Sequence, residues 1–186
     1  MEAVERTRPI TVPEYLKCEA AGQERHEYIS GSIYAMAGAS ERHNIIAGNI
    51  FNLLSNHLRN GPCRAYIADF KVRLEVNRED IFYYPDVMVG CVRDGVEEYY
   101  LRYPKLVIEV LSPSTEATDR REKLINYTQI PTLDEYVIVA QDTKEVLLHR
   151  RHEGWKPNLV NTADALLRFD SLKLSLPLGQ IYEGVS

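Results

Sequence analysis

The sequence predicts a fold of the α/β or α+β class, in which a mixed β-sheet is flanked by helices. Three observations support this prediction. Apolar runs of strand length occur throughout residues 63–112 and again over residues 135–151. A helix-like segment at about residues 115–130 separates the two groups, and strand–helix–strand order is typical of a sheet with a covering helix. Segments with hairpin character lie before and after this unit and predict antiparallel strands.

Two helices and a hairpin are expected in the first third of the chain. Thr11 and Glu14 have the spacing of a capping box, so a short helix begins there and ends near Gly22. The alternating stretch HEYISGSIYAM is typical of a hairpin that turns at Ser30-Gly31. Ser40 can cap a longer helix, with apolar residues at spacings of three and four, that extends to about residue 59.

Strand patterns dominate the rest of the chain. We expect strands in CRAYIADFKVRLEV (63–76), FYYPDVMVG (82–90) and LRYPKLVIEVLS (101–112), then a helix from about Thr115 to Ile130. The stretch EYVIVAQDTKEVLLHRR (135–151) indicates two strands joined by a polar turn, and short strand-like pieces continue to LPLGQIYEGV (176–185). No linker divides the sequence, so residues 1–186 are predicted to form a single domain.

The composition is that of an ordinary soluble globular protein. Hydrophobic residues make up 45% of the chain, and the net charge of −5 argues against strong general affinity for nucleic acid, although a local basic patch can still bind phosphate. No apolar stretch approaches transmembrane length and no apolar targeting region is present, so we expect a cytoplasmic protein without membrane contact. Cys18, Cys63 and Cys91 lack a CxxC or zinc-finger spacing, which predicts reduced thiols.

Glu109 is the most unusual residue in the sequence. It interrupts the apolar run LVIEVL (106–111), which has the character of a buried strand. An ionised carboxylate there costs several kcal/mol unless a partner or a metal ion compensates it. A structural ion pair with a nearby arginine is one explanation, and a functional site is the other.

Asp86 provides a second carboxylate in a similar setting. It follows Pro85 at the start of the apolar run Val87-Met88-Val89, and pairing of the two strands would bring Asp86 and Glu109 to one end of a sheet. Two desolvated carboxylates repel each other unless one is protonated or a cation lies between them. Such a site suits Mg²⁺ or Mn²⁺, whereas Asp86 alone is equally typical of a turn.

The helix predicted after Glu109 contributes a possible cation. Asp119, Lys123 and Tyr127 are four residues apart and form one stripe along its surface. Lys123 is then either half of an exposed ion pair with Asp119 or a cation that faces the carboxylates and stabilises a reacting phosphate. Arg120 could contact a phosphate or remain solvated.

Together these motifs resemble the PD-(D/E)XK nuclease superfamily, and more closely its Uma-two family of restriction-endonuclease-like proteins. The resemblance extends over almost the whole chain and depends on HEYISG, PDV, PKLVIEVLSPST and the following DxxxKxxxY. It implies a restriction-endonuclease-like fold in which Asp86 and Glu109 bind Mg²⁺ or Mn²⁺. Glu27 would be an additional acid. His43, at the start of the long helix, is either a capping or surface residue or a functional residue that hydrogen-bonds a phosphate or the metal-bound water.

This chain departs from the superfamily pattern at two positions. The superfamily places a lysine two residues after the glutamate, where this chain has Leu111. A lysine that has moved to the next helix, Lys123, would restore the charge. The family also often has a glutamate after the hairpin glycine, where this chain has Ser32.

Three functions fit these residues. The first is a metal-dependent endonuclease that hydrolyses DNA phosphodiester bonds, and the second is a catalytically inactive module that binds nucleic acid or protein. A glycosidase acid–base pair is a weaker third reading, because a single Trp offers little to stack sugars. Aromatic clusters such as Phe82-Tyr83-Tyr84 can line a homodimer face, pack in the core or stack bases.

Overall fold

The computed structural model describes residues 8–91, 95–113, 116–162 and 164–185. In these residues the strands form two mixed sheets, with orders β2-β1-β5-β4-β7 and β11-β10-β9-β8-β6-β3, and the hairpin β12-β13. The helices and strands are α1 (Val12–Ala21), β1 (His26–Ile29), β2 (Ser32–Ala35), α2 (Glu41–His57), β3 (Arg64–Ile67), β4 (Lys71–Val76), β5 (Glu79–Tyr83), β6 (Val87–Gly90), β7 (Tyr100–Leu101), β8 (Pro104–Val110), α3 (Glu116–Thr118), a π-helical turn (Asp119–Lys123), α4 (Leu124–Tyr127), β9 (Glu135–Val139), β10 (Val146–Arg150), β11 (Pro157–Val160), β12 (Leu166–Phe169), β13 (Leu174–Pro177) and α5 (Leu178–Ile181).

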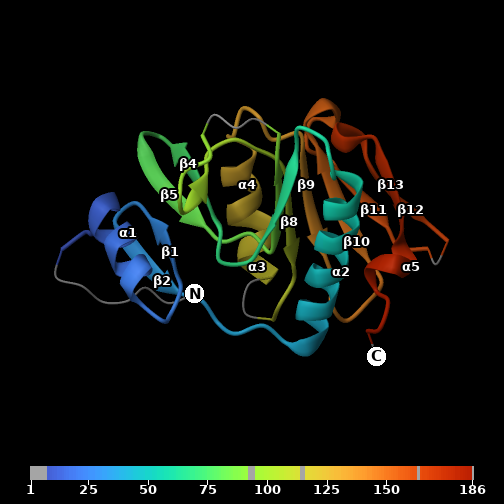
Figure 1. Cartoon of the computed structure of the whole chain (residues 1–186), viewed down its shortest axis with the longest axis horizontal. Helices are drawn as coiled ribbons and strands as arrows, with labels where there is room; N and C mark the ends of the chain where they lie inside the picture. Colours follow the sequence, from blue (N-terminus) through green and yellow to red (C-terminus); the bar gives the residue numbers. More distant parts are fainter. Residues whose placement is uncertain (1–7, 92–94, 114–115, 163, 186) are drawn as a thin grey trace.

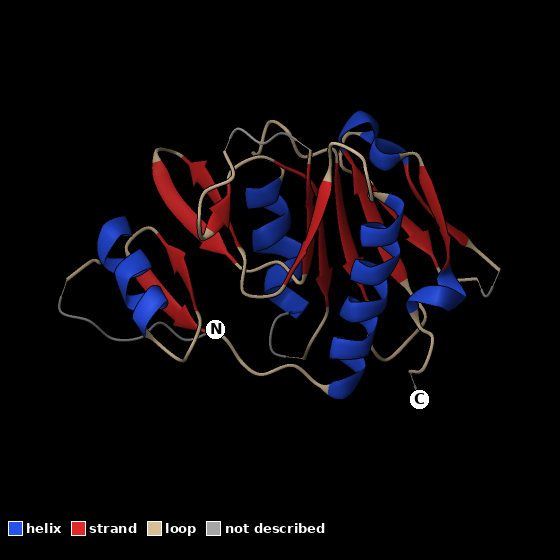
Figure 2. Ribbon diagram, viewed as in Figure 1, coloured by secondary structure: helices blue, strands red, loops and turns tan. Residues whose placement is uncertain are grey.

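The larger sheet lies between helices on both faces, as Figures 1 and 2 show. Side chains alternate along β8, so that Leu106 and Ile108 join the core formed with α2, whereas Val107 and Leu111 join the core formed with α4. The smaller sheet contributes β4 and β5 to this second core, on the far side of α4. The predicted mixed α/β architecture with flanking helices is therefore confirmed, although it contains more than one sheet.

The first elements form as the sequence predicts. Thr11 accepts a hydrogen bond from the backbone N–H of Glu14, whose side chain accepts one from the Thr11 N–H in return, so the capping box is complete. The hairpin β1–β2 turns at Ser30-Gly31, where both residues have positive φ and a Cβ on Gly31 would lie 2.8 Å from Pro9. Ser40 caps α2.

Two predicted strands are each divided between the sheets. Residues 63–76 form β3 in the larger sheet and β4 in the smaller one, because the backbone turns at Ala68-Asp69 with φ values of 33° and 48°. Residues 82–90 likewise form β5 and β6, separated by Tyr84-Pro85-Asp86. At both points the chain passes from one sheet to the other, and residues of both points line the pocket described below.

The segment after β8 and the end of the chain also differ from expectation. The predicted start of a helix at Thr115 lies outside the described residues, and from Glu116 onward the helix is interrupted by the π-helical turn. The strand-like end of the chain is in part helical, since Leu178–Ile181 forms α5. No helix in the described part of the chain is long and apolar enough to cross a membrane.

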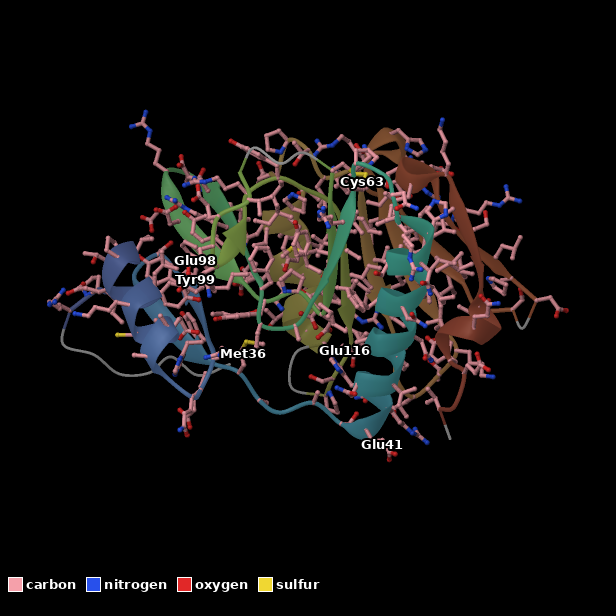
Figure 3. The ribbon with its side chains drawn as sticks, in the orientation of Figure 1. Met36, Glu41, Cys63, Glu98, Tyr99 and Glu116 are labelled. Atoms are coloured by element: carbon pink, nitrogen blue, oxygen red, sulfur yellow. A yellow bond between two sulfur atoms is a disulfide. The ribbon has the colours of Figure 1, made fainter. Side chains whose placement is uncertain are left out.

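The prediction that all cysteines are reduced thiols is wrong for two of them. Cys63 and Cys91 form a disulfide, and Cys18 is free. β3 pairs antiparallel with β6, with Arg64 opposite Gly90, so the next residues outward meet although 28 positions separate them. Figure 3 shows Cys63 at the edge of the larger sheet, away from Met36. Sequence spacing alone does not reveal such a pairing, because it depends on sheet register.

Candidate functional site

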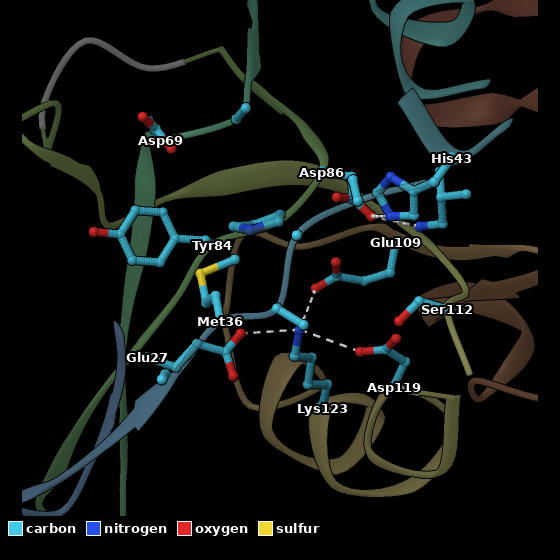
Figure 4. Close-up of a pocket in the computed structure, with 17 residues that line it drawn as sticks. Glu27, Met36, His43, Asp69, Tyr84, Asp86, Glu109, Ser112, Asp119 and Lys123 are labelled. Atoms are coloured by element: carbon cyan, nitrogen blue, oxygen red, sulfur yellow. Dashed lines mark hydrogen bonds and ion pairs between the residues drawn. The ribbon is translucent and has the colours of Figure 1, made fainter. Parts of the chain in front are cut away.

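A pocket of about 330 Å³ lies where the two sheets, α2 and the π-helical turn meet. Its lining includes residues of each predicted group: Glu27 from β1, His43 from α2, Asp86 before β6, Glu109 from β8 and Lys123 from the π-helical turn. Figure 4 shows these side chains converging from separate elements. The structure therefore brings together five of the six residues selected from the sequence.

Asp86 and Glu109 are neighbours because β6 and β8 are paired. Val87 lies opposite Ile108 in an antiparallel register, so the preceding residue Asp86 comes beside Glu109. The backbone N–H of Val110 donates a hydrogen bond of 2.7 Å to Asp86 Oδ2 and fixes that carboxylate at the end of the strand. Glu109 is 3% exposed and points toward the face of the sheet that α4 covers.

Lys123 reaches this buried carboxylate from the adjoining helix. The parallel pairing of β8 with β9 requires a crossover, and the helical segment of that crossover lies over the sheet face that carries Glu109. Lys123 Nζ lies 3.2 Å from Glu109 Oε1, 3.0 Å from Glu27 Oε1 and 3.1 Å from Asp119 Oδ1. Lys123 is 4% exposed, so it is not part of a solvated surface pair.

Aromatic side chains complete the surroundings of the lysine and the glutamate. The Tyr127 hydroxyl donates a hydrogen bond of 2.8 Å to Glu109 Oε1, the same oxygen that Lys123 contacts. The Lys123 amine also lies 5.3 Å from the centre of the Tyr83 ring, a cation–π distance. Tyr136 donates to the carbonyl oxygen of Asp119 and so holds the π-helical turn against β9.

Burial and mutual charge shift the pKa values of this cluster. Burial raises the pKa of Glu109 well above its ordinary range, and Lys123 only partly opposes that shift. The pKa of Glu27 is raised in the same way. Burial works against the charged form of Lys123, but the nearby Glu109, Glu27 and Asp119 outweigh it and raise the lysine pKa well above its usual value. The neighbouring carboxylates therefore favour the charged form of Lys123.

The donor set fits a hard divalent cation. The pocket lining contains one ammonium group and five carboxylates, those of Glu27, Asp69, Asp86, Glu109 and Asp119, so negative charge is in excess when they are ionised. Glu27 Oε2 is buried without a hydrogen-bond partner. Within the described residues no three His, Cys, Asp or Glu side chains are grouped to bind a metal by themselves. Mg²⁺ commonly takes one or two carboxylates with water and phosphate, and Asp86 and Glu109 would be the carboxylates that hold it here.

His43 contacts Asp86 rather than open solvent. Its Nε2 lies 3.2 Å from Asp86 Oδ2, and its side chain is 12% exposed. Burial lowers the pKa of His43, but the hydrogen bond and charge of Asp86 more than compensate, so the net shift is upward. His43 thus helps to orient Asp86, from a position in the first turn of α2 that Ser40 caps.

Arg120 is the selected residue that the structure does not bring to the pocket. Its guanidinium pairs with Glu116 at 2.8 Å, on the exposed side of the helix. Sequence reasoning also overlooked a role for Asp119, which is 1% exposed and contacts Lys123. The available signal was the spacing of four residues between Asp119 and Lys123, which a surface pair shares.

Comparison with known proteins identifies the family. Residues 12–179 match the family model described as "Uma2: Putative restriction endonuclease". The chain belongs to the Uma2 family. Two proteins of Synechocystis sp. (strain PCC 6803), both described as uncharacterized, are similar to this Uma2 chain. One, slr1290, is 39% identical over 175 residues, 93% of this chain and 91% of that protein. The other, sll1609, is 33% identical over 144 residues, 76% of this chain and 80% of that protein.

The fold of this Uma2 chain is similar to that of a solved structure. The crystal structure of a "putative nuclease belonging to DUF820" from Anabaena variabilis ATCC 29413 superposes with a TM-score of 0.74 at 20% sequence identity. The match covers 94% of this chain and 98% of that chain. The restriction-endonuclease-like fold and the Uma2 family predicted from the motifs are therefore confirmed.

Proposed function

We propose that this Uma2 chain is a divalent-metal-dependent endonuclease that hydrolyses DNA phosphodiester bonds. The observation that carries the proposal is the meeting of Asp86, Glu109 and Lys123 in one pocket, since these residues come from separate elements and are far apart in sequence. Asp86 and Glu109 would hold Mg²⁺ or Mn²⁺. When bound, the ion would polarise a phosphoryl oxygen and make a bound water more acidic.

The remaining side chains have roles that follow from their contacts. Lys123 supplies a fixed positive charge beside the carboxylates, where negative charge develops on the phosphate as it reacts. Glu27 and Asp119 hold the lysine amine in place from either side. Tyr127 holds one oxygen of Glu109, and His43 holds one oxygen of Asp86.

A catalytically inactive binding module is the second candidate. The observation that favours it is that the Lys123 amine already lies within 3.2 Å of three carboxylates. Lys123 would then be a purely structural ion-pair partner that links β1, β8 and the π-helical turn. In that case the pocket would have no need of a divalent ion.

Cleavage assays separate these candidates. Purified protein is incubated with supercoiled plasmid and with labelled single-stranded, duplex and branched oligonucleotides, in Mg²⁺, in Mn²⁺ and in EDTA. We expect metal-dependent cleavage that Asp86→Asn and Glu109→Gln each lower at least a hundredfold, an effect typical of losing an electrostatic group in an active site. Asp142→Asn is the matched control, because Asp142 is exposed, pairs with Arg42 and lies outside the pocket lining. Absence of cleavage on every substrate, or cleavage unchanged in both variants, would overturn the proposal.

A further inference from the structure

The pocket has the depth and size of a site for one small group rather than an open groove. Four of its charged side chains, those of Glu27, Glu109, Asp119 and Lys123, are each no more than 4% exposed. Its volume of about 330 Å³ is at the lower end of the range for small-molecule sites. A base in a paired duplex is stacked and held by its partner, so a whole nucleotide enters a pocket of this size only when its strand is unpaired.

Two apolar segments line the pocket mouth. One wall is the exposed segment 35–39 that leads from β2 to α2, which consists of alanines, Gly38 and Met36, a side chain 40% exposed. The other consists of Ala68 and Tyr84-Pro85, at the two points where the chain crosses between the sheets. Figure 4 shows Met36 and Tyr84 on the same side of the carboxylate cluster. Such walls suit the flat, apolar face of an unpaired base.

The pocket mouth lacks the cations that duplex binding requires. Among the described lining residues Lys123 is the one lysine or arginine, and three carboxylates already engage it. Three arginines near the lining residues pair with carboxylates: Arg25 with Asp69, Arg42 with Asp142, and Arg120 with Glu116. Arg121 is exposed and lies outside the lining. Binding of either form of DNA gains from phosphate contacts by free lysines and arginines, but an unpaired strand can also gain affinity from contacts to its bases, which a duplex keeps paired.

We infer that the substrate is an unpaired DNA strand, one nucleotide of which enters the pocket. Its base lies against the Met36 wall, and its phosphate lies at Asp86 and Glu109. The strand is thus selected by access and by apolar contact, because the mouth does not offer rows of cations. The cleavage part of this inference rests on the proposed function, whereas the strand preference can be measured by binding alone.

Fluorescence anisotropy in Ca²⁺ tests the preference without depending on cleavage. Labelled single-stranded DNA of mixed sequence is compared with the same strand in a blunt duplex. We expect a Kd for the single strand at least tenfold lower than for the duplex. Equal binding, tighter binding of the duplex, or no binding of either DNA would overturn the inference.

Two pairs of variants locate the binding site. A Cβ on Gly38 would meet nothing within 4 Å, so Gly38→Leu can project into the pocket mouth without a clash; Gly179 in α5 is equally open and Gly179→Leu is its control. We expect Gly38→Leu to weaken single-strand binding at least tenfold and Gly179→Leu less than twofold. Met36→Glu should weaken binding similarly, whereas Ile125→Glu, at a side chain 63% exposed and outside the lining, should not. Unchanged binding in both Gly38→Leu and Met36→Glu would overturn the inference.

The outcomes also separate this inference from the proposed function. Metal-dependent cleavage of duplex at least as fast as of single strand would overturn the strand preference and leave the nuclease proposal intact. Preferential single-strand binding that Gly38→Leu weakens, without cleavage in any metal, would support the strand preference and overturn the nuclease.

Discussion

Removal of the Lys123 amine is the perturbation whose effect the structure defines best. Lys123→Met keeps a side chain of similar length but leaves Glu27, Glu109 and Asp119 buried without their common cation. Each contact near 3.1 Å corresponds to about 5 kcal/mol at an effective dielectric constant of 20. Much of this attraction is offset, because the variant no longer has to bury a charged amine. Removal of one partner of a buried ion pair typically costs about 3–5 kcal/mol, which is the loss we expect in the free energy of unfolding.

The loss should depend on pH in a defined direction. In the variant Glu27 and Glu109 lack the charge of Lys123, which opposes the rise of their pKa values, so their folded-state pKa values rise further above those of the unfolded chain. A carboxylate of this kind destabilises the fold fully at a pH above its folded-state pKa, and not at all below its unfolded pKa, where both states are protonated. The deficit of Lys123→Met should therefore be largest near pH 8 and shrink as the pH falls toward 5.

Urea denaturation at several pH values measures this effect. Circular dichroism gives the free energy of unfolding of the wild type and of Lys123→Met. The control is Lys105→Met, because Lys105 forms a single pair with Asp134 at 2.5 Å and is about one third exposed. A partly exposed pair of this kind contributes at most about 1 kcal/mol. A loss below 1 kcal/mol for Lys123→Met at pH 8, or a loss that grows as the pH falls, would refute the electrostatic reasoning.

Three further predictions concern single contacts. Tyr127→Phe removes the hydrogen bond to the buried carboxyl group of Glu109 and should lower the free energy of unfolding, measured by urea denaturation, by about 1–3 kcal/mol. An unchanged free energy of unfolding would show that this hydrogen bond does not stabilise the fold. In metal-free protein, NMR titration should give His43 a pKa above the ordinary histidine value, and Asp86→Asn should lower it; a His43 pKa unaffected by that variant would contradict the pairing. Thiol titration of unreduced, denatured protein should detect one thiol instead of three, and reduction of Cys63–Cys91, whose partners are 28 positions apart, should cost about 3–4 kcal/mol; three free thiols would exclude the disulfide.

The central part of the site was accessible from the sequence because it follows simple rules. Glu109 stood out as a charge within an apolar run, and antiparallel pairing of two such runs is enough to bring Asp86 beside it. The spacing of four residues from Lys123 to Tyr127 put both on one helix face, where the structure has both contact Glu109. These features depend on local periodicity, which a sequence displays directly.

The parts that were missed depend on tertiary context. The chain bends at Ala68-Asp69, where both residues have positive φ, and the residue types alone do not predict this conformation. A carboxylate on a helix looks the same in sequence whether it pairs at the surface or is buried, so Asp119 could not be told from Glu116. The disulfide likewise depends on the register of β3 and β6 and on no local pattern.

A crystal structure of the protein with Mn²⁺ tests most directly whether Asp86 and Glu109 bind a divalent ion. We expect one strong anomalous peak about 2.1 Å from carboxylate oxygens of both Asp86 and Glu109, with Lys123 still in contact with Glu109. Crystals of Asp86→Asn prepared in the same way should lack the peak. A well-ordered pocket without anomalous density at a saturating Mn²⁺ concentration would show that these carboxylates do not form a metal site.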